Sequence, residues 1–409
     1  MNILYINHYA GGPKYGMEYR LYYLAREWVR AGHTVTIVAA SYSHLHSRQP
    51  ATTSAFTVEV IEDIRFVWCQ TPAYSGNGLG RVLNIVSFLR RLGQSSEWLQ
   101  DKPEMVIASS TYPADIWPAR RLADRHGAKL VWEVHDLWPL SPMELGGMSK
   151  FHPFILWMQF AENVACRSAD AVVSLLPFAG SHLIEHGMDP SKFFYVPNGV
   201  DPQEWVEGCD QAELPAMHSE ALVRAREAKH LLVGYAGSHG VANALDSLLD
   251  SAALMRDAPV TWLLIGGGPE KARLVQRVRS ENLVNVIMLD PVPKVLIPAI
   301  LKSMDVLYVG HQRVPLYRFG ISPNKIMDYM MSARPIICAI DAANDLVQEA
   351  GCGMTILPEN PTELAKAVER MRLLSLAERD RMGMAGRSYV EKNHLYPFLA
   401  NSFLKAITT

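Results

Sequence analysis

The segment from Tyr317 to Met330 combines the start of a helix with a positive charge. Ser322 fits the N-cap of a helix and Pro323 fits its first position. The free amide groups of a first turn and the helix dipole both favour an anion. Ser322, Pro323, Asn324 and Lys325 are therefore predicted to hold a diphosphate. Asp328, about one turn further along, is predicted to accept hydrogen bonds from ribose hydroxyls. The alternative is a capped surface helix with solvated Lys325 and Asp328.

Three glycine-rich turns each follow a predicted strand and precede a predicted helix. They span residues 11–16, 237–240 and 266–270. Glycines in such turns let an anionic ligand approach the helix N-terminus closely. The glycines and serine that we expect to contribute to a site made of backbone amides are Gly12, Gly16, Gly237, Ser238 and Gly267. A single turn of this kind is also compatible with an ordinary tight connection.

A histidine and an aspartate follow directly after the predicted strand Leu130–Val134. Ligands bind at the carboxyl ends of strands in open α/β sheets, so the position of His135 predicts a catalytic role. A structural histidine is the alternative. Residues 135–147 are expected to form a loop.

Several function classes are disfavoured by the sequence. The first glycine turn lacks the G-x-G-x-x-G pattern, and Val38–Ser41 ends the second strand without an acidic residue, which counts against an NAD-dependent oxidoreductase. The sequence has no Asp-x-Asp, HExxH, P-loop or Cys/His cluster, so no metal site or cofactor is expected. A formal charge of -2 argues against a general nucleic-acid binder.

Localisation is predicted from cysteine usage and from the apolar segments. Five scattered cysteines without CxxC spacing fit a reducing compartment. The N-terminus lacks the pattern of a signal peptide, and no uncharged apolar run reaches the about 18 residues that span a bilayer. We expect a cytoplasmic protein, or one attached to a membrane from the cytoplasmic side.

The order of elements predicts an α/β fold. Strand Asn2–Asn7, a helix over Met17–Ala31 and strand Val35–Ala40 make a βαβ opening, and strand–helix pairs continue to about residue 200. After a charged linker at Pro202–Lys229, the alternation starts again at Leu231. The sequence therefore predicts two doubly wound domains, with a site in the cleft between them.

Leu79–Trp98 is expected to form a basic amphipathic helix. The segment is rich in apolar residues and carries three positive charges, Arg81, Arg90 and Arg91. Within it, no acidic residue occurs before Glu97. Such helices bind anionic bilayers. The alternative is that its apolar stripe packs on the first sheet.

The whole chain resembles glycosyltransferase family 4, whose retaining enzymes have the two-domain GT-B fold. The resemblance rests on five motifs in their order: Gly11–Gly16, Glu133–Pro139, Pro197–Asp201, Gly266–Glu270 and Ser322–Pro335. The last motif especially resembles the branch that builds bacterial surface polysaccharides, including enzymes proposed to transfer N-acetylfucosamine-type sugars. The resemblance implies two Rossmann-like domains, residues 1–200 for the acceptor and residues 201–394 for the donor. Residues 395–409 would be a helix that crosses back to the first domain.

The resemblance also implies roles. The donor would be a nucleotide-sugar, usually a UDP-sugar, and the acceptor a glycan on polyprenyl diphosphate, in O-antigen or capsule synthesis. His135 would position the donor sugar and stabilise charge, and Asp136 and Glu144 would contact the acceptor. Asp328 takes the place of the second glutamate of the family's E-x7-E motif, whereas Gly320 stands where many members have the first. Metal-independent transfer with retention is the first reading; a sugar-nucleotide epimerase and a non-catalytic sugar-nucleotide binding protein are the alternatives.

Overall fold

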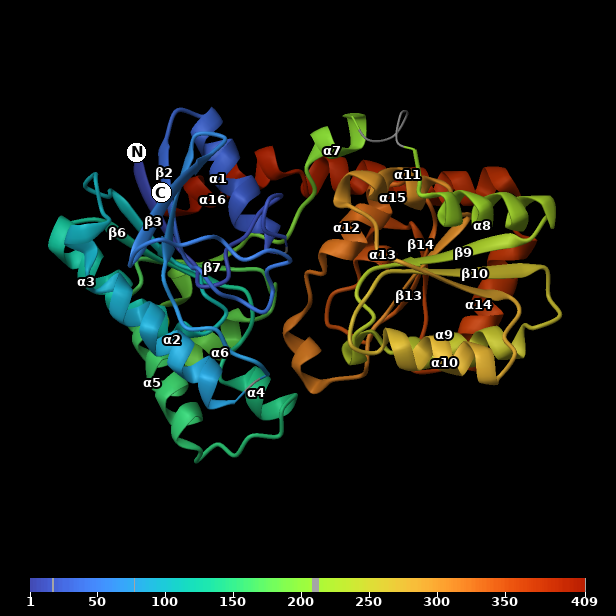
Figure 1. The fold of residues 1–409 in the computed structure, drawn as a ribbon, viewed down its shortest axis with the longest axis horizontal. Coiled ribbons are helices and arrows are strands. Elements are labelled where there is room, and N and C mark those ends of the chain that lie inside the picture. The colour runs from blue at the N-terminus through green and yellow to red at the C-terminus, as the bar shows by residue number, and fades with distance from the viewer. Residues whose placement is uncertain (17, 77, 208–212, 409) are drawn as a thin grey trace. The chain divides into compact units, whose positions relative to one another are not determined.

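The computed structural model describes residues 1–16, 18–76, 78–207 and 213–408, and divides into two compact units (Figure 1). Unit 1 comprises Met1–Asn198, Arg318–Ser322 and Tyr396–Thr409. Unit 2 comprises Gly199–Tyr317 and Pro323–Leu395. Cys209 of the predicted linker and Met17 of the first predicted helix lie outside the described residues.

Unit 1 is built on an eight-stranded sheet in the order β3-β4-β2-β1-β5-β6-β7-β8. All neighbours are parallel except β3 and β4, which form an antiparallel pair at one edge. Helices cover both faces of this sheet (Figure 1). The strands are β1 (Asn2–Ile6), β2 (Thr34–Ala40), β3 (Phe56–Ile61), β4 (Ile64–Cys69), β5 (Met105–Ala108), β6 (Lys129–Val134), β7 (Ala171–Ser174) and β8 (Phe193–Tyr195). The helices are α1 (Tyr19–Arg30), α2 (Leu79–Leu92), α3 (Ile116–His126), α4 (Leu140–Glu144), α5 (Pro153–Ser168), α6 (Gly180–Glu185) and α16 (Tyr396–Thr408).

Unit 2 is built on a six-stranded parallel sheet in the order β11-β10-β9-β12-β13-β14. The strands are β9 (Leu231–Ala236), β10 (Val260–Ile265), β11 (Val286–Leu289), β12 (Val306–Gly310), β13 (Ile336–Ala339) and β14 (Gly353–Thr355). The helices are α7 (Pro202–Glu207), α8 (Ala216–Glu227), α9 (Leu245–Leu254), α10 (Lys271–Ser280), α11 (Ile297–Lys302), α12 (Asn324–Met331), α13 (Leu346–Ala350), α14 (Pro361–Leu373) and α15 (Leu376–Asn393).

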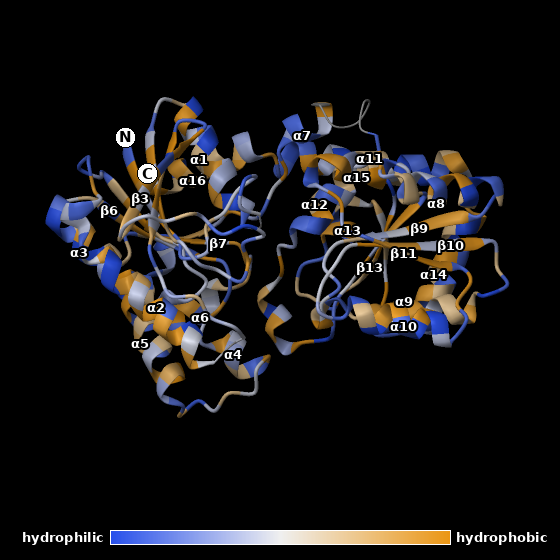
Figure 2. Cartoon of the chain, viewed as in Figure 1, coloured by the Kyte–Doolittle hydropathy of each residue, from blue (hydrophilic) through white to orange (hydrophobic). Residues whose placement is uncertain are grey.

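Continuous apolar runs explain why these segments form central strands. Every residue of β5, β9 and β10 is buried, as expected where helices cover both faces of a parallel sheet. Hydropathy colouring shows the sheet strands as largely hydrophobic and the outer faces of many helices as hydrophilic (Figure 2). The predicted α/β class with two doubly wound sheets is confirmed.

The C-terminal helix α16 completes unit 1 by packing on α1. The Trp28 indole donates a hydrogen bond to the carbonyl of Ala400 at 3.0 Å, although the two residues are 372 positions apart. The Trp28 and Phe403 rings lie 5.2 Å apart and are 1% and 0% exposed. The first sheet is therefore covered on this side by both ends of the chain.

Some local predictions were wrong. The helix that begins at Leu79 ends at Leu92 rather than near Trp98, because Gly93 follows and a separate 3₁₀ turn forms at Ser95–Glu97. The loop predicted over 135–147 contains the short helix α4. The segment 202–229, predicted as a linker with a short helix, holds two helices, α7 and α8. Helix α5 and the antiparallel pair β3–β4 were not anticipated.

The four described cysteines are buried free thiols: Cys69, Cys166, Cys338 and Cys352. None of the helices in the described ranges is long and apolar enough to cross a bilayer.

Candidate active site

In unit 1, the site is centred on the carboxylate of Glu133, near the carboxyl end of β6. Glu133 is 0% exposed. It accepts hydrogen bonds from the Tyr5 hydroxyl at 2.5 Å, from Arg20 Nε at 2.9 Å and from the Ser109 hydroxyl at 2.7 Å. Strands β1, β5 and β6 are neighbours in the sheet, so their carboxyl ends bring Tyr5, Ser109 and Glu133 together.

His135 belongs to this cluster because it lies two residues after Glu133, on the same side of the extended chain. Its Nε2 lies 3.1 Å from Glu133 Oε2 and 2.9 Å from the Ser109 hydroxyl. Among the hydrogen bonds of the described residues, none involves Nδ1 of His135. The structure thus anchors one ring nitrogen of His135 in the protein and leaves the other for a ligand.

The charges of this cluster are mutually compensated. Burial opposes a charge on Glu133, but the Arg20 guanidinium, the His135 ring and the hydrogen bonds hold the pKa of Glu133 well below its usual range. Burial also opposes a charge on His135, but the charge and hydrogen bond of Glu133, together with the Glu18 carboxylate, raise the pKa of His135. A raised pKa favours the protonated imidazole, which is a poorer base and a better stabiliser of negative charge than the neutral ring.

Glu18 is a second carboxylate near this cluster, and the sequence analysis missed it. It precedes α1 in a left-handed conformation, with φ of 49° and ψ of 49°, and its side chain does not cap the helix. Burial raises the pKa of Glu18, while His135 lowers it. A left-handed glutamate is strained by about 1–3 kcal/mol, and such strain concentrates at functional sites. The signal available in the sequence was an acidic residue between the first glycine turn and the helix.

The two residues predicted to bind an acceptor have partners in the protein. Asp136 accepts hydrogen bonds from the Leu137 amide at 2.9 Å and from the Ser141 hydroxyl at 2.7 Å, so it stabilises the turn into α4. Glu144 accepts two hydrogen bonds from Arg318, at 2.9 and 2.7 Å. Their contact with an acceptor stays a prediction.

The predicted cap of the diphosphate helix is wrong. Helix α12 begins at Asn324, with Pro323 as its N-cap and no side-chain capping bond. The Ser322 hydroxyl instead accepts a hydrogen bond from the Asn198 amide at 2.8 Å, and the Ser322 carbonyl accepts one from Asn198 Nδ2 at 2.6 Å. Ser322 is therefore occupied in holding the Pro197–Asp201 motif, and both residues belong to unit 1.

In unit 2, Lys325 extends from the second residue of α12 toward β9. Its ammonium donates to the Tyr235 hydroxyl at 2.9 Å and to Asn243 Oδ1 at 2.8 Å, and lies 4.4 Å from the centre of the Tyr235 ring. No carboxylate within the described ranges forms an ion pair with it. Burial lowers the pKa of Lys325 to about 7. Lys325 is thus a cation without an anionic partner, which is the arrangement that an anionic ligand would complete.

Gly237 lies beside the end of the Lys325 side chain, with a φ of 157° that side chains rarely adopt. A Cβ at Gly237 would lie 2.7 Å from Cε of Lys325. The glycine turn at residues 266–270 is also closely packed, since a Cβ at Gly266 would lie 1.9 Å from the Gly237 carbonyl oxygen. One of the predicted amide donors is already used, because the Gly237 amide bonds to the Ile265 carbonyl at 3.0 Å. The neighbouring His239 amide likewise bonds to the Gly267 carbonyl at 2.7 Å.

The first glycine turn closes on itself within unit 1. The Gly16 amide donates to the Gly12 carbonyl at 2.8 Å. A Cβ at Gly16 would lie 2.6 Å from the Ser47 hydroxyl oxygen, whereas one at Gly12 would lie 3.5 Å from the Tyr22 side chain. The amide of Gly16 is therefore bound within the protein, and donor binding by this turn stays a prediction.

Asp328 faces different neighbours from Lys325. Burial raises the pKa of Asp328 to about 6, and the surrounding groups are Lys294, Glu204 and the Trp205 indole, which donates a hydrogen bond. The ribose-binding role of Asp328 stays a prediction.

Ser238 and Gly240 lie in the turn before the 3₁₀ segment Val241–Asn243. A pocket in unit 2 is lined by Gly240, by residues at the start of α9, and by Glu270.

Two family patterns match the chain. One is described as a glycosyl transferase 4-like domain and matches residues 15–199. The other is described as glycosyl transferases group 1 and matches residues 230–372. The chain is a family 4 glycosyltransferase.

A relative of this glycosyltransferase matches over nearly its whole length. It is 22% identical over 387 residues to the putative colanic acid biosynthesis glycosyl transferase WcaI of Escherichia coli strain K12, a match that covers 91% of this chain and 93% of that protein.

Solved structures with the GT-B fold also match nearly end to end. The sucrose-phosphate synthase of Thermosynechococcus elongatus gives a TM-score of 0.73 at 16% identity, with 99% of this chain and 97% of the other covered. Anabaena HepE in complex with UDP and glucose gives 0.67 at 14% identity, with 100% and 99% covered. WaaG, a glycosyltransferase of lipopolysaccharide biosynthesis, gives 0.68 at 14% identity, with 99% of both chains covered. The predicted GT-B fold is confirmed.

Proposed function

We propose that this glycosyltransferase moves a sugar from a UDP-sugar to a lipid-linked glycan during synthesis of a bacterial surface polysaccharide, with retention of the anomeric configuration. The observation that carries the donor class is Lys325, a half-buried ammonium without an anionic partner among the described residues. Three of the similar solved structures contain a bound nucleotide or nucleotide-sugar: UDP, UDP-glucose and UDP-2-fluoro glucose. The product class is supported by the colanic acid relative and by WaaG.

In the proposed reaction, the acceptor oxygen attacks the anomeric carbon from the side of the leaving phosphate. The bond between that carbon and the phosphate oxygen breaks as the new glycosidic bond forms. The acceptor proton passes to the departing phosphate oxygen, and UDP is released. The Lys325 ammonium stabilises the charge that develops on the diphosphate, and the His135 ring hydrogen-bonds to the donor sugar. The site groups therefore act by charge stabilisation and positioning.

The transfer is proposed to need no divalent ion at the diphosphate, since Lys325 and backbone amides supply the positive charge there. Activity is expected to persist in EDTA. Strict dependence on added magnesium or manganese would contradict this part of the proposal.

The proposed function is tested by measuring UDP release from a panel of UDP-sugars, with and without a polyprenyl-diphosphate-linked glycan. Release that needs the acceptor supports a transferase. Conversion of a UDP-sugar without acceptor would instead support an epimerase, and binding without turnover a non-catalytic protein.

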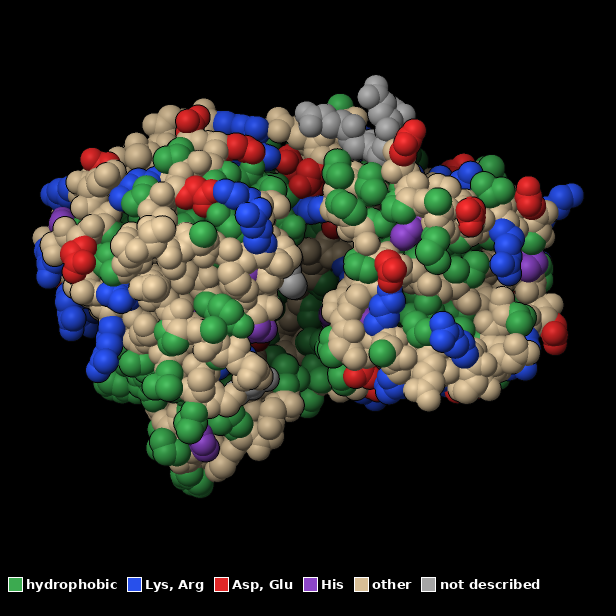
Figure 3. Space-filling model, viewed as in Figure 1, with side chains coloured by type: hydrophobic (Ala, Val, Ile, Leu, Met, Phe, Trp, Pro, Cys, Tyr) green, Lys and Arg blue, Asp and Glu red, His purple; other side chains and the backbone are tan. Residues whose placement is uncertain are grey.

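Access to a lipid-linked acceptor is proposed to use an apolar surface of unit 1. The helix α2 packs inward through Ile85, Phe88 and Leu92, and Arg81 donates to the Tyr9 hydroxyl at 3.1 Å, so much of the predicted membrane stripe is core. Large apolar side chains on α2 and near or on α5 are nevertheless exposed, and hydrophobic side chains gather over this side of unit 1 (Figure 3). The set consists of Leu79, Leu83, Phe151, Leu156 and Phe160, which are 83%, 63%, 73%, 54% and 61% exposed.

Flotation with anionic liposomes tests the membrane contact. The double variant Leu156→Asp with Phe160→Asp is expected to lose flotation that the wild type shows at low salt. Leu254→Asp is the matched control, because Leu254 is 62% exposed on α9 of unit 2. A wild type that never floats would overturn the membrane contact and leave the transferase proposal in place.

A further inference from the structure

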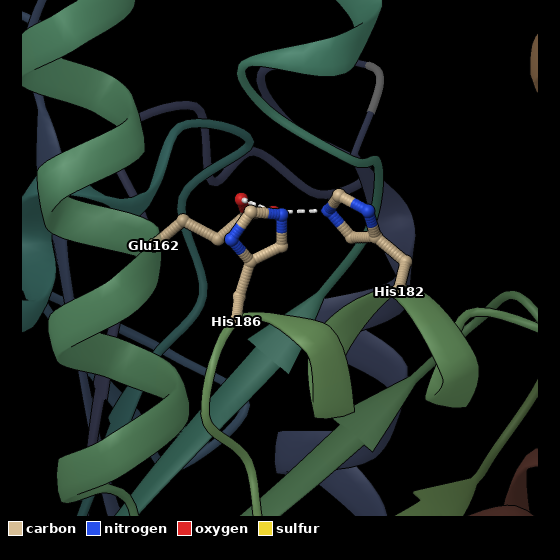
Figure 4. Close-up of side chains that lie close together, drawn as sticks. All are labelled: Glu162, His182 and His186. Carbon is tan, nitrogen blue, oxygen red and sulfur yellow. Dashed lines mark hydrogen bonds and ion pairs between the residues drawn. The ribbon is translucent and has the colours of Figure 1, made fainter.

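Three potential metal ligands meet between α5 and α6, on elements that contribute nothing to the Glu133 cluster. Glu162 lies on α5, His182 lies on α6, and His186 caps α6. One ligand atom from each lies within 4.8 Å of the other two. Figure 4 shows both imidazole rings turned toward the Glu162 carboxylate. The two histidines are four residues apart, which places them on one face of the helix.

The hydrogen bonds around His186 leave its Nε2 with a lone pair and no hydrogen. Gln159 Nε2 lies 2.7 Å from Glu162 Oε2 and 3.1 Å from both Asn163 Oδ1 and His186 Nδ1. The shortest contact of His186 Nδ1 is with Asn163 Oδ1 at 2.9 Å, and this amide oxygen can only accept, so we assign the ring hydrogen to Nδ1. In the neutral ring, Nε2 then carries a lone pair. Nε2 lies 3.9 Å from Glu162 Oε2, so two acceptors face one another across a gap.

The carboxylate of Glu162 also lacks a strong positive partner. Its side chain is 0% exposed, and within the described residues its ion pairs are formed only with the imidazoles of His182 and His186. A buried carboxylate requires a charge partner or a metal ion. Metal-binding histidines typically donate their second ring nitrogen to a carbonyl oxygen, as His186 does to Asn163.

The spacing of the ligand atoms fits a transition metal. Zinc binds histidine nitrogen and carboxylate oxygen at about 2.0–2.2 Å in a tetrahedron, which separates neighbouring ligand atoms by about 3.4 Å. Here Glu162 Oε1 lies 2.9 Å from His182 Nε2, and Glu162 Oε2 lies 3.9 Å from His186 Nε2. We propose that Glu162, His182 and His186 bind a zinc ion through one carboxylate and two imidazole nitrogens. The His186 side chain is 26% exposed, which provides a route for the ion.

The proposed ion would have a structural role within unit 1. It would join α5 to α6, because its ligands come from both. The His182 ring packs on the Phe319 ring with centroids 5.6 Å apart, and the Phe178 amide donates to the Phe319 carbonyl at 3.1 Å. Zinc binding would therefore also stabilise the contacts that hold the segment Arg318–Ser322 against α6, and this segment belongs to unit 1.

The test is a zinc titration of the full chain after metal removal by a chelator, in competition with a chromophoric zinc indicator. The wild type is expected to bind one equivalent of zinc and to unfold at a higher temperature with zinc present. His186→Ala should weaken binding by more than about 100-fold, because it removes a ligand. Asn163→Ala should weaken it by about 10–100-fold, since the hydrogen bond that orients the ring is lost.

His126→Ala is the control, because His126 lies at the end of α3, away from the three ligands in sequence and element. It should bind zinc as the wild type does. Equal zinc affinity of the wild type and His186→Ala, or no zinc binding by the wild type, would overturn the proposal and leave a hydrogen-bonded network only. Asn163→Ala keeps all three ligands, so it decides the matter if His186→Ala does not fold. UDP affinity, measured on the same samples by calorimetry, tests the proposed function separately.

Discussion

The charged groups at the carboxyl end of the first sheet and those at the start of α12 are arranged in opposite ways. In unit 1, Glu133 and Arg20 are fully buried and bonded to each other, with His135 against the same carboxylate. In unit 2, Lys325 has neutral hydrogen-bond partners only, Tyr235 and Asn243. The first cluster is complete in the free protein, whereas the second needs an anion. Substitutions should therefore cost folding stability in the first and ligand affinity in the second.

The largest effect is expected for Glu133→Gln. The change leaves the Arg20 guanidinium buried without its carboxylate, which should lower the free energy of unfolding by about 3–5 kcal/mol. Urea denaturation monitored by circular dichroism measures it. Glu270→Gln is the matched control, because the Glu270–Arg273 pair is on the surface and should contribute about 1 kcal/mol or less. Equal losses in both variants would remove the contrast between the buried and exposed pairs.

A smaller effect, on rate, is expected for His135→Ala. If the protonated ring stabilises charge mainly in the transition state, turnover should fall by about 10²–10³-fold while the dissociation constant of the donor changes little. Steady-state kinetics combined with calorimetry separates the two. A folded, fully active variant would refute the catalytic role, and an unfolded one would favour a purely structural histidine.

For Lys325→Ala, we expect weaker UDP binding without a loss of stability, because the free protein loses no ion pair. A charge-assisted hydrogen bond contributes about 1.5–3 kcal/mol, which corresponds to about 10- to 150-fold in affinity. Calorimetry with UDP and thermal unfolding of the free variant make the two measurements. Unchanged affinity would take this segment out of the donor site.

The smallest effect is a pH dependence of UDP binding. Burial lowers the pKa of Lys325 to about 7 in the free protein, and a bound diphosphate should raise it again. Below pH 7 the ammonium is already charged, so binding takes up no proton. Above pH 7 binding must protonate the amine, and affinity should fall by at most tenfold per pH unit until the pKa of the bound state is reached. Lys325→Ala should abolish this slope, and a slope retained in that variant would assign it to another group.

The parts of the site that follow a local pattern could be predicted from the sequence. The strand before His135 and the glycine turns were located by alternation of strand and helix. The partners of Glu133 could not be located in this way, because Arg20 lies 113 residues earlier in the chain and meets Glu133 only when the sheet forms. The same reason explains the error at Ser322, since a serine before a helix fits a cap equally well whether or not Asn198 binds it.

The zinc ligands show the same limit of local pattern. His182 and His186 have helical spacing, but Glu162 lies 20 residues before His182 and on another helix. A scan for contiguous motifs therefore finds no metal site there. Burial cannot be predicted from local pattern either, because only the folded structure reveals that Lys325 is half-buried while Arg90, on α2, is exposed.

The packing of α16 on α1 has a consequence for how this protein is made. Ribosomes add about 5–20 residues per second, so Trp28 is synthesised about 20–75 seconds before Ala400, its partner 372 positions later. During that interval, the face of α1 that receives Phe403 has no native cover. Nascent chains would expose that aromatic surface to chaperones until translation ends, and early termination would leave it open to aggregation.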